Sequence, residues 1–152
     1  MMKYALRGSL AFGLVALVGC GPTADDVVGT WMYDDPSTLI SDCGDAGKTE
    51  TDLTGGSVVF AAGAEHDLIS GDSDCAAAFT FSGGEIHADG YEGAGCTGDE
   101  GALPEGYTSE GEIYWVYSSE GDAAKLVPTG SVSVTGNEIT CTVSYDASLT
   151  KM

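Results

Sequence analysis

Apolar and polar residues alternate along many short segments of this chain. The alternation is clearest near the C-terminus, where Ile139, Cys141, Val143 and Tyr145 are separated by Thr and Ser residues. Side chains two residues apart share one face of a β-strand, so these odd-numbered residues are predicted to face inward. After residue 19, no helical period continues over three turns. The pattern therefore predicts an all-β domain.

Clusters of Gly, Asp and Asn separate these segments and indicate antiparallel strands joined by turns. Gly83-Gly84 is able to adopt the positive φ angles of a tight hairpin turn, and Gly136-Asn137 marks the final hairpin. The weakly apolar residues 93–109 contain five Gly, which predicts a long loop. The segments expected to be extended are residues 27–33, 50–54, 57–61, 66–70, 76–82, 85–89, 112–118, 123–127, 130–135 and 138–149.

An antiparallel meander of about eight or nine strands has two ways to hide its edges. It closes into a barrel or stacks into a sandwich, because an open sheet of that width exposes unpaired backbone groups. In residues 112–118 both faces are apolar, with Trp115 and Tyr117 on one side and Tyr114 and Val116 on the other. Such a strand is covered on both sides, or one of its faces lines a cavity.

Five aromatic residues are candidates to line that cavity and to bind a small apolar ligand: Trp31, Tyr33, Trp115, Tyr117 and Tyr145. The favoured interpretation is a filled core. A small domain with many Gly and Ala needs its large side chains to supply buried area, which stabilises by about 25 cal/mol per Å².

The beginning of the chain has an unusual distribution of basic and apolar residues. Residues 1–7 contain Lys3 and Arg7 without an acid, and residues 8–18 form an apolar run too short to span a bilayer. Leu17-Val18-Gly19-Cys20 follows. This order resembles a bacterial lipoprotein signal peptide with its lipobox, in which the Cys becomes the lipidated first residue.

The resemblance implies a signal peptide at 1–19, a tether at 20–26 and a single β domain at 27–152. Acyl chains on Cys20 would anchor the domain to a membrane, since several chains make a lasting anchor where one does not. Gly21, in place of the Asp that resembles an inner-membrane retention signal, favours the outer membrane of a Gram-negative bacterium.

Charge narrows the range of partners. The chain has 24 Asp and Glu residues against five Lys and Arg residues, a formal net charge of −19. Only Lys48, Lys125 and Lys151 follow residue 19. Nucleic acid is excluded as a partner, because binding it requires Lys and Arg to replace condensed counterions.

Four cysteines remain once Cys20 is assigned to lipid: Cys43, Cys75, Cys96 and Cys141. An even number of cysteines in an exported domain predicts two disulfides. Of the three pairings, Cys75 with Cys96 and Cys43 with Cys141 is preferred. The first pair flanks an expected hairpin, and the second ties the start of the domain to its last strand. The spacing matches no structural zinc site, so no metal is expected there.

Val28-Gly29-Thr30-Trp31 resembles the Gly-x-Trp signature that opens lipocalin-type barrels. In that family the Trp closes one end of the barrel, and an Arg near the last strand packs across it. Here Lys151 is the only basic residue near the end, and Thr51-Asp52 is followed by Leu53 in place of the lipocalin Tyr. The resemblance implies a lipocalin-like barrel.

A second resemblance covers most of the chain after Cys20. It is to small cysteine-containing lipoproteins of the myxobacterial type, which run from a lipobox through Gly-Thr-Trp to a Gly-rich β domain. That group implies a location and a fold but no activity. The segments that carry the resemblance are Gly29-Thr30-Trp31, Cys43-Gly44, Gly56-Ser57-Val58-Val59-Phe60, Asp67-Leu68-Ile69, Cys75 with Phe79 and Ser82-Gly83, Cys96-Thr97, and Gly136 with Cys141 and Leu149.

Oxygen ligands for calcium are present in Asp72-Ser73-Asp74 and in Asp42 with Asp45. Their spacing does not match an EF-hand loop, and Asp in a turn is better explained by hydrogen bonds to its own backbone. The two histidines, His66 and His87, lie in strand-like segments without a nucleophile motif nearby. We therefore expect neither an enzyme nor a bound cofactor.

The sequence as a whole predicts a lipid-anchored lipoprotein of the cell envelope that acts as a structural or interaction module. Its acidic segment from Gly98 to Glu112 is the expected contact surface for an envelope protein. The alternative function is a lipocalin-like binder of a small apolar ligand.

Overall fold

The computed structural model describes residues 21–72, 74–121 and 123–152. The expected signal peptide and the expected lipid-bearing Cys20 lie outside this range. Within it, the chain folds as the expected all-β domain, with a short helix and a single 3-10 turn beside the strands. The elements are α1 (Ala24–Val27), β1 (Gly29–Tyr33), β2 (Thr38–Asp42), η1 (Gly44–Ala46), β3 (Lys48–Asp52), β4 (Ser57–Ala62), β5 (Leu68–Ser70), β6 (Ala76–Ser82), β7 (Glu85–Glu92), β8 (Thr108–Glu120), β9 (Ala123–Gly136), β10 (Ile139–Asp146) and β11 (Leu149–Lys151).

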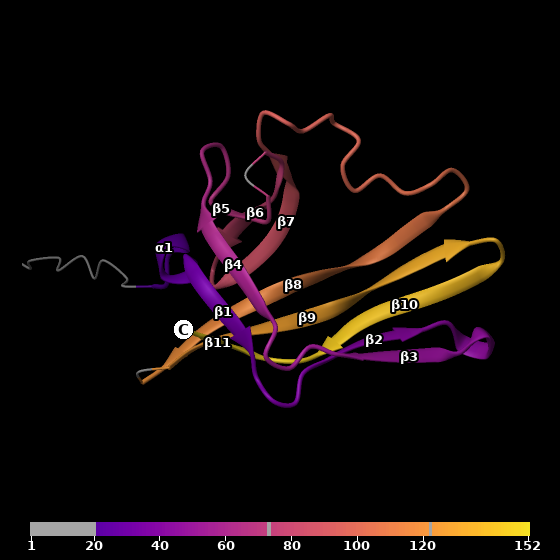
Figure 1. Cartoon of the computed structure of the whole chain (residues 1–152), viewed down its shortest axis with the longest axis horizontal. Coiled ribbons are helices and arrows are strands. Elements are labelled where there is room, and N and C mark those ends of the chain that lie inside the picture. Colours follow the sequence, from indigo (N-terminus) through magenta and orange to yellow (C-terminus); the bar gives the residue numbers. More distant parts are fainter. Residues whose placement is uncertain (1–20, 73, 122) are drawn as a thin grey trace, which may run out of the picture.

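Eight strands close into an antiparallel barrel in the order β11-β1-β4-β5-β6-β7-β8-β9, and β11 pairs with β9 to complete the circle. The choice between barrel and sandwich is thereby decided. Three further strands, β10, β2 and β3, continue the sheet outward from β9. They form a second, open part of the molecule beside the barrel (Figure 1).

The observed strands differ from the expected ones in ways that shape the open part. Strand β2 was not expected, because the adjacent Leu39 and Ile40 break the alternation. Strand β9 continues through Pro128, where two separate strands were expected. Strands β10 and β11, which were expected to be one strand, belong to different parts of the sheet. Val27 belongs to α1, so the first strand starts at Gly29.

Aromatic side chains pack against one another inside the barrel. The rings of Phe60, Phe79 and Trp115 meet edge to face, with centroids 5.5 to 5.8 Å apart. Trp31 is fully buried and meets the Tyr117 ring at 6.2 Å in the same geometry. Edge-to-face packing is favourable because the positive rim of one ring faces the negative face of the other. Aliphatic residues complete the buried cluster: Val27, Leu68, Ile86, Leu126 and Leu149.

Trp31 closes the end of the barrel beside α1. Its Nε1 atom donates a hydrogen bond of 2.7 Å to the Val27 carbonyl, which satisfies the buried indole. The Nζ atom of Lys151 lies 5.7 Å from the Trp31 ring centroid and donates to the Asp26 carbonyl. Lys151 thus lies across the Trp where the lipocalin resemblance assigns an Arg, and a cation over an indole face is attracted to it.

A polar cluster stabilises the closure of the barrel, where β11 pairs with both β1 and β9. Asp34 accepts hydrogen bonds from Lys125 Nζ at 2.7 Å and from the Ser148 and Thr150 hydroxyls at 2.6 Å. Burial alone would raise the pKa of Asp34, but these hydrogen bonds outweigh it and lower that pKa. Three strands therefore share one charged contact at the closure point.

Two disulfides are present, with the pairing that the sequence analysis preferred. Cys43 joins Cys141 and so fixes η1 and the end of β2 to β10 in the open part of the sheet. Cys75 joins Cys96 and fixes the loop after β7 to the start of β6. Each restricts the unfolded chain and stabilises the fold by about 2–4 kcal/mol.

The filled barrel generates a stability prediction on a single strand. Phe60 is 1% exposed inside the barrel, and its neighbour Val59 is 53% exposed on the outer face. Phe60→Ala should lower the free energy of unfolding by about 3–5 kcal/mol through lost burial and a cavity, and Val59→Ala by less than about 1 kcal/mol. Urea denaturation with both disulfides intact measures the two changes. Similar losses for both variants would contradict the filled interior.

Candidate binding surface

The long hairpin of β8 and β9 forms part of the barrel wall and continues beyond it. There it joins β10, β2 and β3 in the open part of the sheet, called the open sheet below. Two glycines on these strands, Gly111 and Gly130, have φ angles near +90°. A Cβ atom on Gly111 would lie 2.3 Å from the Ser131 carbonyl oxygen, and one on Gly130 equally close to the Glu112 oxygen. Only glycine tolerates both the positive φ angle and the lack of space for a Cβ atom. The hairpin leaves the barrel wall near Gly111 and Gly130, and we attribute this to the backbone conformation of these two glycines.

The inward face of the barrel continues past these glycines onto the open sheet. Paired positions run without a shift from Tyr117 and Leu126 in the barrel to Ser109 and Val134 beyond it. Side chains on the same face therefore follow the period of two along both strands. On the open sheet this face carries the partly exposed residues Leu39, Ile113, Val132, Val134, Cys141, Val143 and Tyr145.

The opposite face of the open sheet is mostly polar, although Ile40 and Tyr114 also lie on it. Hydroxyl groups of Ser133 and Thr142 form a hydrogen bond of 2.8 Å across β9 and β10, as do those of Thr135 and Thr140. The outermost strand, β3, is exposed at every residue and carries Lys, Glu and Asp, a composition that discourages further strand pairing. The apolar face therefore differs sharply from the rest of the open sheet.

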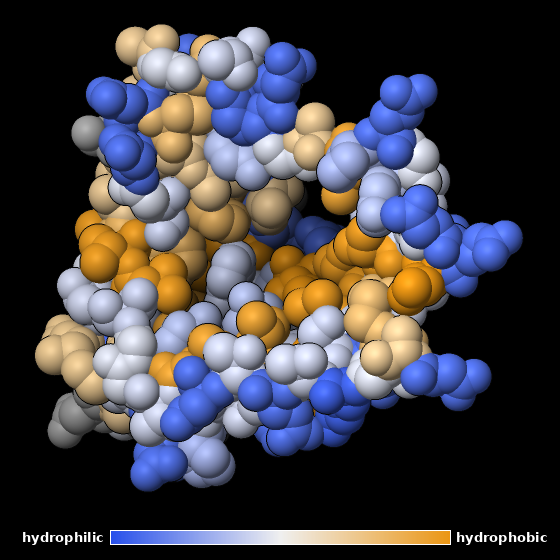
Figure 2. Space-filling view, turned by 45° about the vertical axis from the view of Figure 1, so that its right-hand side comes forward, coloured by the Kyte–Doolittle hydropathy of each residue, from blue (hydrophilic) through white to orange (hydrophobic). Residues whose placement is uncertain are grey.

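A loop of residues 93–107 arches from β7 to β8 beside this face (Figure 1). Figure 2 shows a hollow beneath the arch, with hydrophobic side chains on its floor and hydrophilic side chains on its rim. Near the turn between β9 and β10, the hollow ends in a small pocket, called the tip pocket. Its lining residues are Tyr107, Val134, Gly136, Asn137, Ile139 and Cys141.

The arch is held by specific contacts. The Cys75–Cys96 disulfide fixes its first residues, and a hydrogen bond of 2.8 Å from Asn137 Nδ2 to the Tyr107 hydroxyl fixes its last. The Tyr107 ring lies directly against Gly136, where a Cβ atom would collide with it. Within the arch, Glu100 accepts hydrogen bonds from backbone N–H groups of Thr97 and Gly98, which lower the pKa of Glu100 to about 2.

Two tyrosines lie where the barrel interior meets the open face. Tyr33 ends β1 with its side chain on the inner face, and Tyr145 lies on β10. Burial, together with repulsion between the two phenolates, raises the pKa of Tyr33 to about 12. The Tyr33 hydroxyl therefore stays neutral at physiological pH.

The five aromatic residues proposed to line a cavity have separate places. Trp31, Trp115 and Tyr117 pack inside the barrel, whereas Tyr33 and Tyr145 lie at its mouth. The odd-numbered residues of β10 share one face as expected, but the expectation that they face a core is wrong, because β10 lies outside the barrel. The sequence analysis did not identify Leu39, Val132 or Val134. Their alternation was visible, but nothing in it showed that the face lacked a cover.

Histidines and acids outside this surface form local structural contacts. His66 pairs with Glu92 at 3.0 Å, and His87 pairs with Glu85 and Glu112. Asp42 and Asp72 each accept a hydrogen bond from the backbone N–H two residues later, the turn role expected of them. Glu100 lies near Cys75 and Cys96, but those two sulfurs are joined in a disulfide and are not thiolate ligands.

No family model, curated protein or solved structure matches this chain. In the described part of the chain, outside residues 1–20, 73 and 122, there is no helix with the length and apolar character needed to cross a membrane. Functional inference therefore rests on the apolar hollow itself.

Proposed function

We propose that this chain is a lipid-tethered module of the bacterial cell envelope, related to small cysteine-containing lipoproteins of the myxobacterial type, and that it acts by binding a partner on its open sheet. One observation carries the binding part. The inward apolar face of β8 and β9 extends beyond the barrel onto a sheet that no helix or second sheet layer of the described chain covers. An apolar sheet face is ordinarily buried against a second layer, so an uncovered one marks an interaction site.

The position of the tether supports the same proposal. The helix α1 begins four residues after the expected lipidation site Cys20 and lies at the end of the barrel opposite the open sheet (Figure 1). A strand rises about 3.3 Å per residue, so the 14 residues of β9 extend over roughly 45 Å. A domain anchored through Cys20 would therefore hold its apolar hollow well away from the membrane surface.

A small apolar ligand in the barrel is the second candidate. Its specific support is the Nε1 atom of Trp115, which is buried and has no hydrogen-bond partner in the described structure. An unpaired buried donor is costly, and a ligand acceptor would satisfy it. The Phe60 and Phe79 rings already occupy the space beside Trp115, and we favour the open sheet for that reason.

Binding of the uncharged dye Nile red tests the open sheet. Val143→Asp places a charge on the apolar face, whereas Ser144→Asp places the same charge on the polar face one residue away. Val143→Asp should weaken dye binding about tenfold, because covering a carboxylate with an apolar surface is unfavourable, and Ser144→Asp by less than about twofold. Fluorescence titration measures both.

Two outcomes would contradict the open-sheet proposal. One is equal weakening by the two Asp variants. The other is dye binding that survives Val143→Asp and is lost in Trp115→Ala, which would favour the barrel ligand. Denaturation curves of each variant identify any loss of binding that comes from unfolding.

The tether has its own test. A Cys20→Ser variant cannot be acylated, so it should remain unprocessed or leave the membrane fraction, whereas the unaltered protein stays with the outer membrane. Membrane fractionation with mass spectrometry of the mature N-terminus measures both properties. Identical processing and tethering of the two proteins would contradict lipidation at Cys20.

A further inference from the structure

Acidic side chains occur close to the tip pocket. Three acids lie within two residues in sequence of the tip pocket or of the Cys43–Cys141 disulfide: Asp45 in η1, Glu105 in the arch and Glu138 in the turn between β9 and β10. All three are exposed. Figure 2 shows that the rim of the hollow is hydrophilic and its floor hydrophobic.

The chain's own cations do not neutralise this rim. Lys48 pairs with Glu50 on β3 at 2.6 Å. Lys125 is engaged by Asp34 in the barrel closure, and Lys151 by Asp26 and the Trp31 ring. These are all the Lys and Arg residues of the described chain, so counter-charge for the rim has to come from outside.

From this combination we infer that the hollow binds a cationic amphipathic helix of a partner protein, with apolar side chains against the open sheet and Lys or Arg side chains toward the acidic rim. The inference rests on the proposed binding function and adds the chemistry of the partner. Complementary charge around an apolar contact speeds association and selects the partner.

A helix fits the dimensions of the surface. The apolar face spans β8, β9, β10 and β2, and four strands about 4.8 Å apart present a surface wider than a helix of about 10 Å diameter. Helices also cover apolar sheet faces in many domains. Strand addition is disfavoured at the outer edge, because β3 is exposed and charged throughout.

A second copy of this chain is a poor occupant. Each copy carries a formal net charge of −19, and bringing two acidic rims together is repulsive. The same charge makes an anionic surface unfavourable. The negative field that repels a second copy and an anionic surface attracts a partner that carries cations.

Two synthetic helical peptides of about 18 residues, roughly 27 Å long, test the inference. Both carry Leu at positions i, i+3, i+4 and i+7 on one face; one has Lys on the other face and its twin has Glu. The Lys peptide should bind the intact domain at least about 100-fold more tightly than the Glu peptide at low salt. Its affinity should fall about tenfold or more between 0.1 M and 1 M salt, since the Debye length shortens from about 10 Å to about 3 Å.

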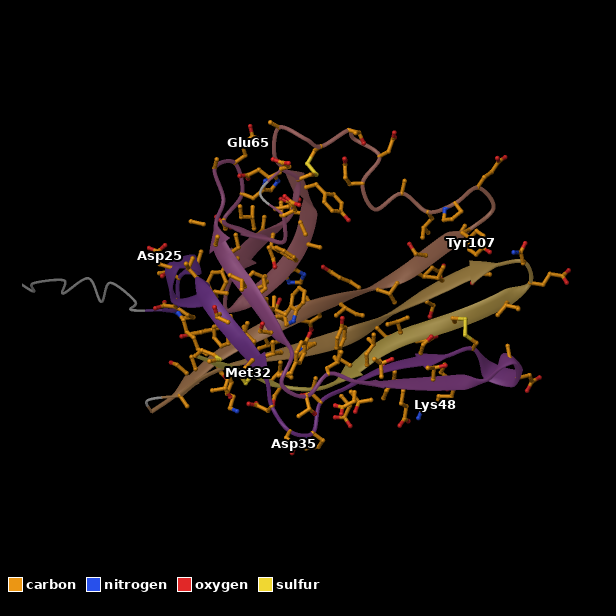
Figure 3. The ribbon with its side chains drawn as sticks, viewed as in Figure 1. Asp25, Met32, Asp35, Lys48, Glu65 and Tyr107 are labelled. Atoms are coloured by element: carbon orange, nitrogen blue, oxygen red, sulfur yellow. A yellow bond between two sulfur atoms is a disulfide. The ribbon has the colours of Figure 1, made fainter. Side chains whose placement is uncertain are left out.

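Matched variants locate the charge effect. The triple variant Asp45→Asn, Glu105→Gln, Glu138→Gln should weaken binding of the Lys peptide about tenfold. The control triple Asp25→Asn, Asp35→Asn, Glu65→Gln removes the same charge from exposed acids far from the tip that Tyr107 marks (Figure 3). It should weaken binding by less than about twofold, because screening limits long-range effects. Fluorescence anisotropy measures the affinities.

Several results would overturn the inference. They are equal affinity for the Lys and Glu peptides, no binding of the Lys peptide, equal weakening by the two triple variants, or sedimentation showing that a second copy covers the face. If Nile red binding still depends on Val143 in any of the first three cases, the proposed binding surface stands and only the cationic helix is rejected. If Nile red binding is independent of Val143, the binding surface itself is rejected.

Discussion

One β-hairpin is shared by the barrel and by the open part of the same sheet, and the rest of the architecture depends on it. Its strands β8 and β9 carry Gly111 and Gly130, where neighbouring carbonyl oxygens leave no room for a Cβ atom. The pairing of β8 with β9, and with it the alternation of side chains, continues past both glycines without a change of register. A face that is buried in the barrel therefore becomes a partly exposed face beyond it.

The buried core and the partly exposed apolar face consequently lie at opposite ends of the molecule. The barrel end holds the edge-to-face aromatic cluster, the Trp31 closure and the Asp34 contact that joins three strands. The open end relies on the Cys43–Cys141 disulfide and on an arch fixed at its two ends. This separation allows the distal face to remain apolar and uncovered, because the barrel core does not depend on it.

Local chemistry explains which features could be predicted from sequence. Period-two alternation predicted the strands around Trp115 and Val143, and the Gly83-Gly84 turn has the expected positive φ angles. The disulfide pairing preferred among three possibilities, because Cys75 and Cys96 flank an expected hairpin, is also the observed one. Closure into a barrel was one of the two expected outcomes.

The open face was not predicted, and the reason is physical. Alternation reports which residues share a face, but it does not report what lies opposite that face. Val143 on β10 and Phe60 on β4 both look inward-facing in the sequence, yet only Phe60 has a second wall across from it. The decisive facts are long-range: β9 changes partner from β11 to β10, and β2 pairs with β10 across a hundred residues of chain.

Our central claim is that one apolar face is buried in the barrel and accessible on the open sheet. Methyl NMR with a soluble paramagnetic agent tests it most directly. The account predicts strong broadening of the Val132, Val134 and Val143 methyl signals and little broadening for Leu68, Ile86 and Leu126, and equal protection of both groups would contradict it.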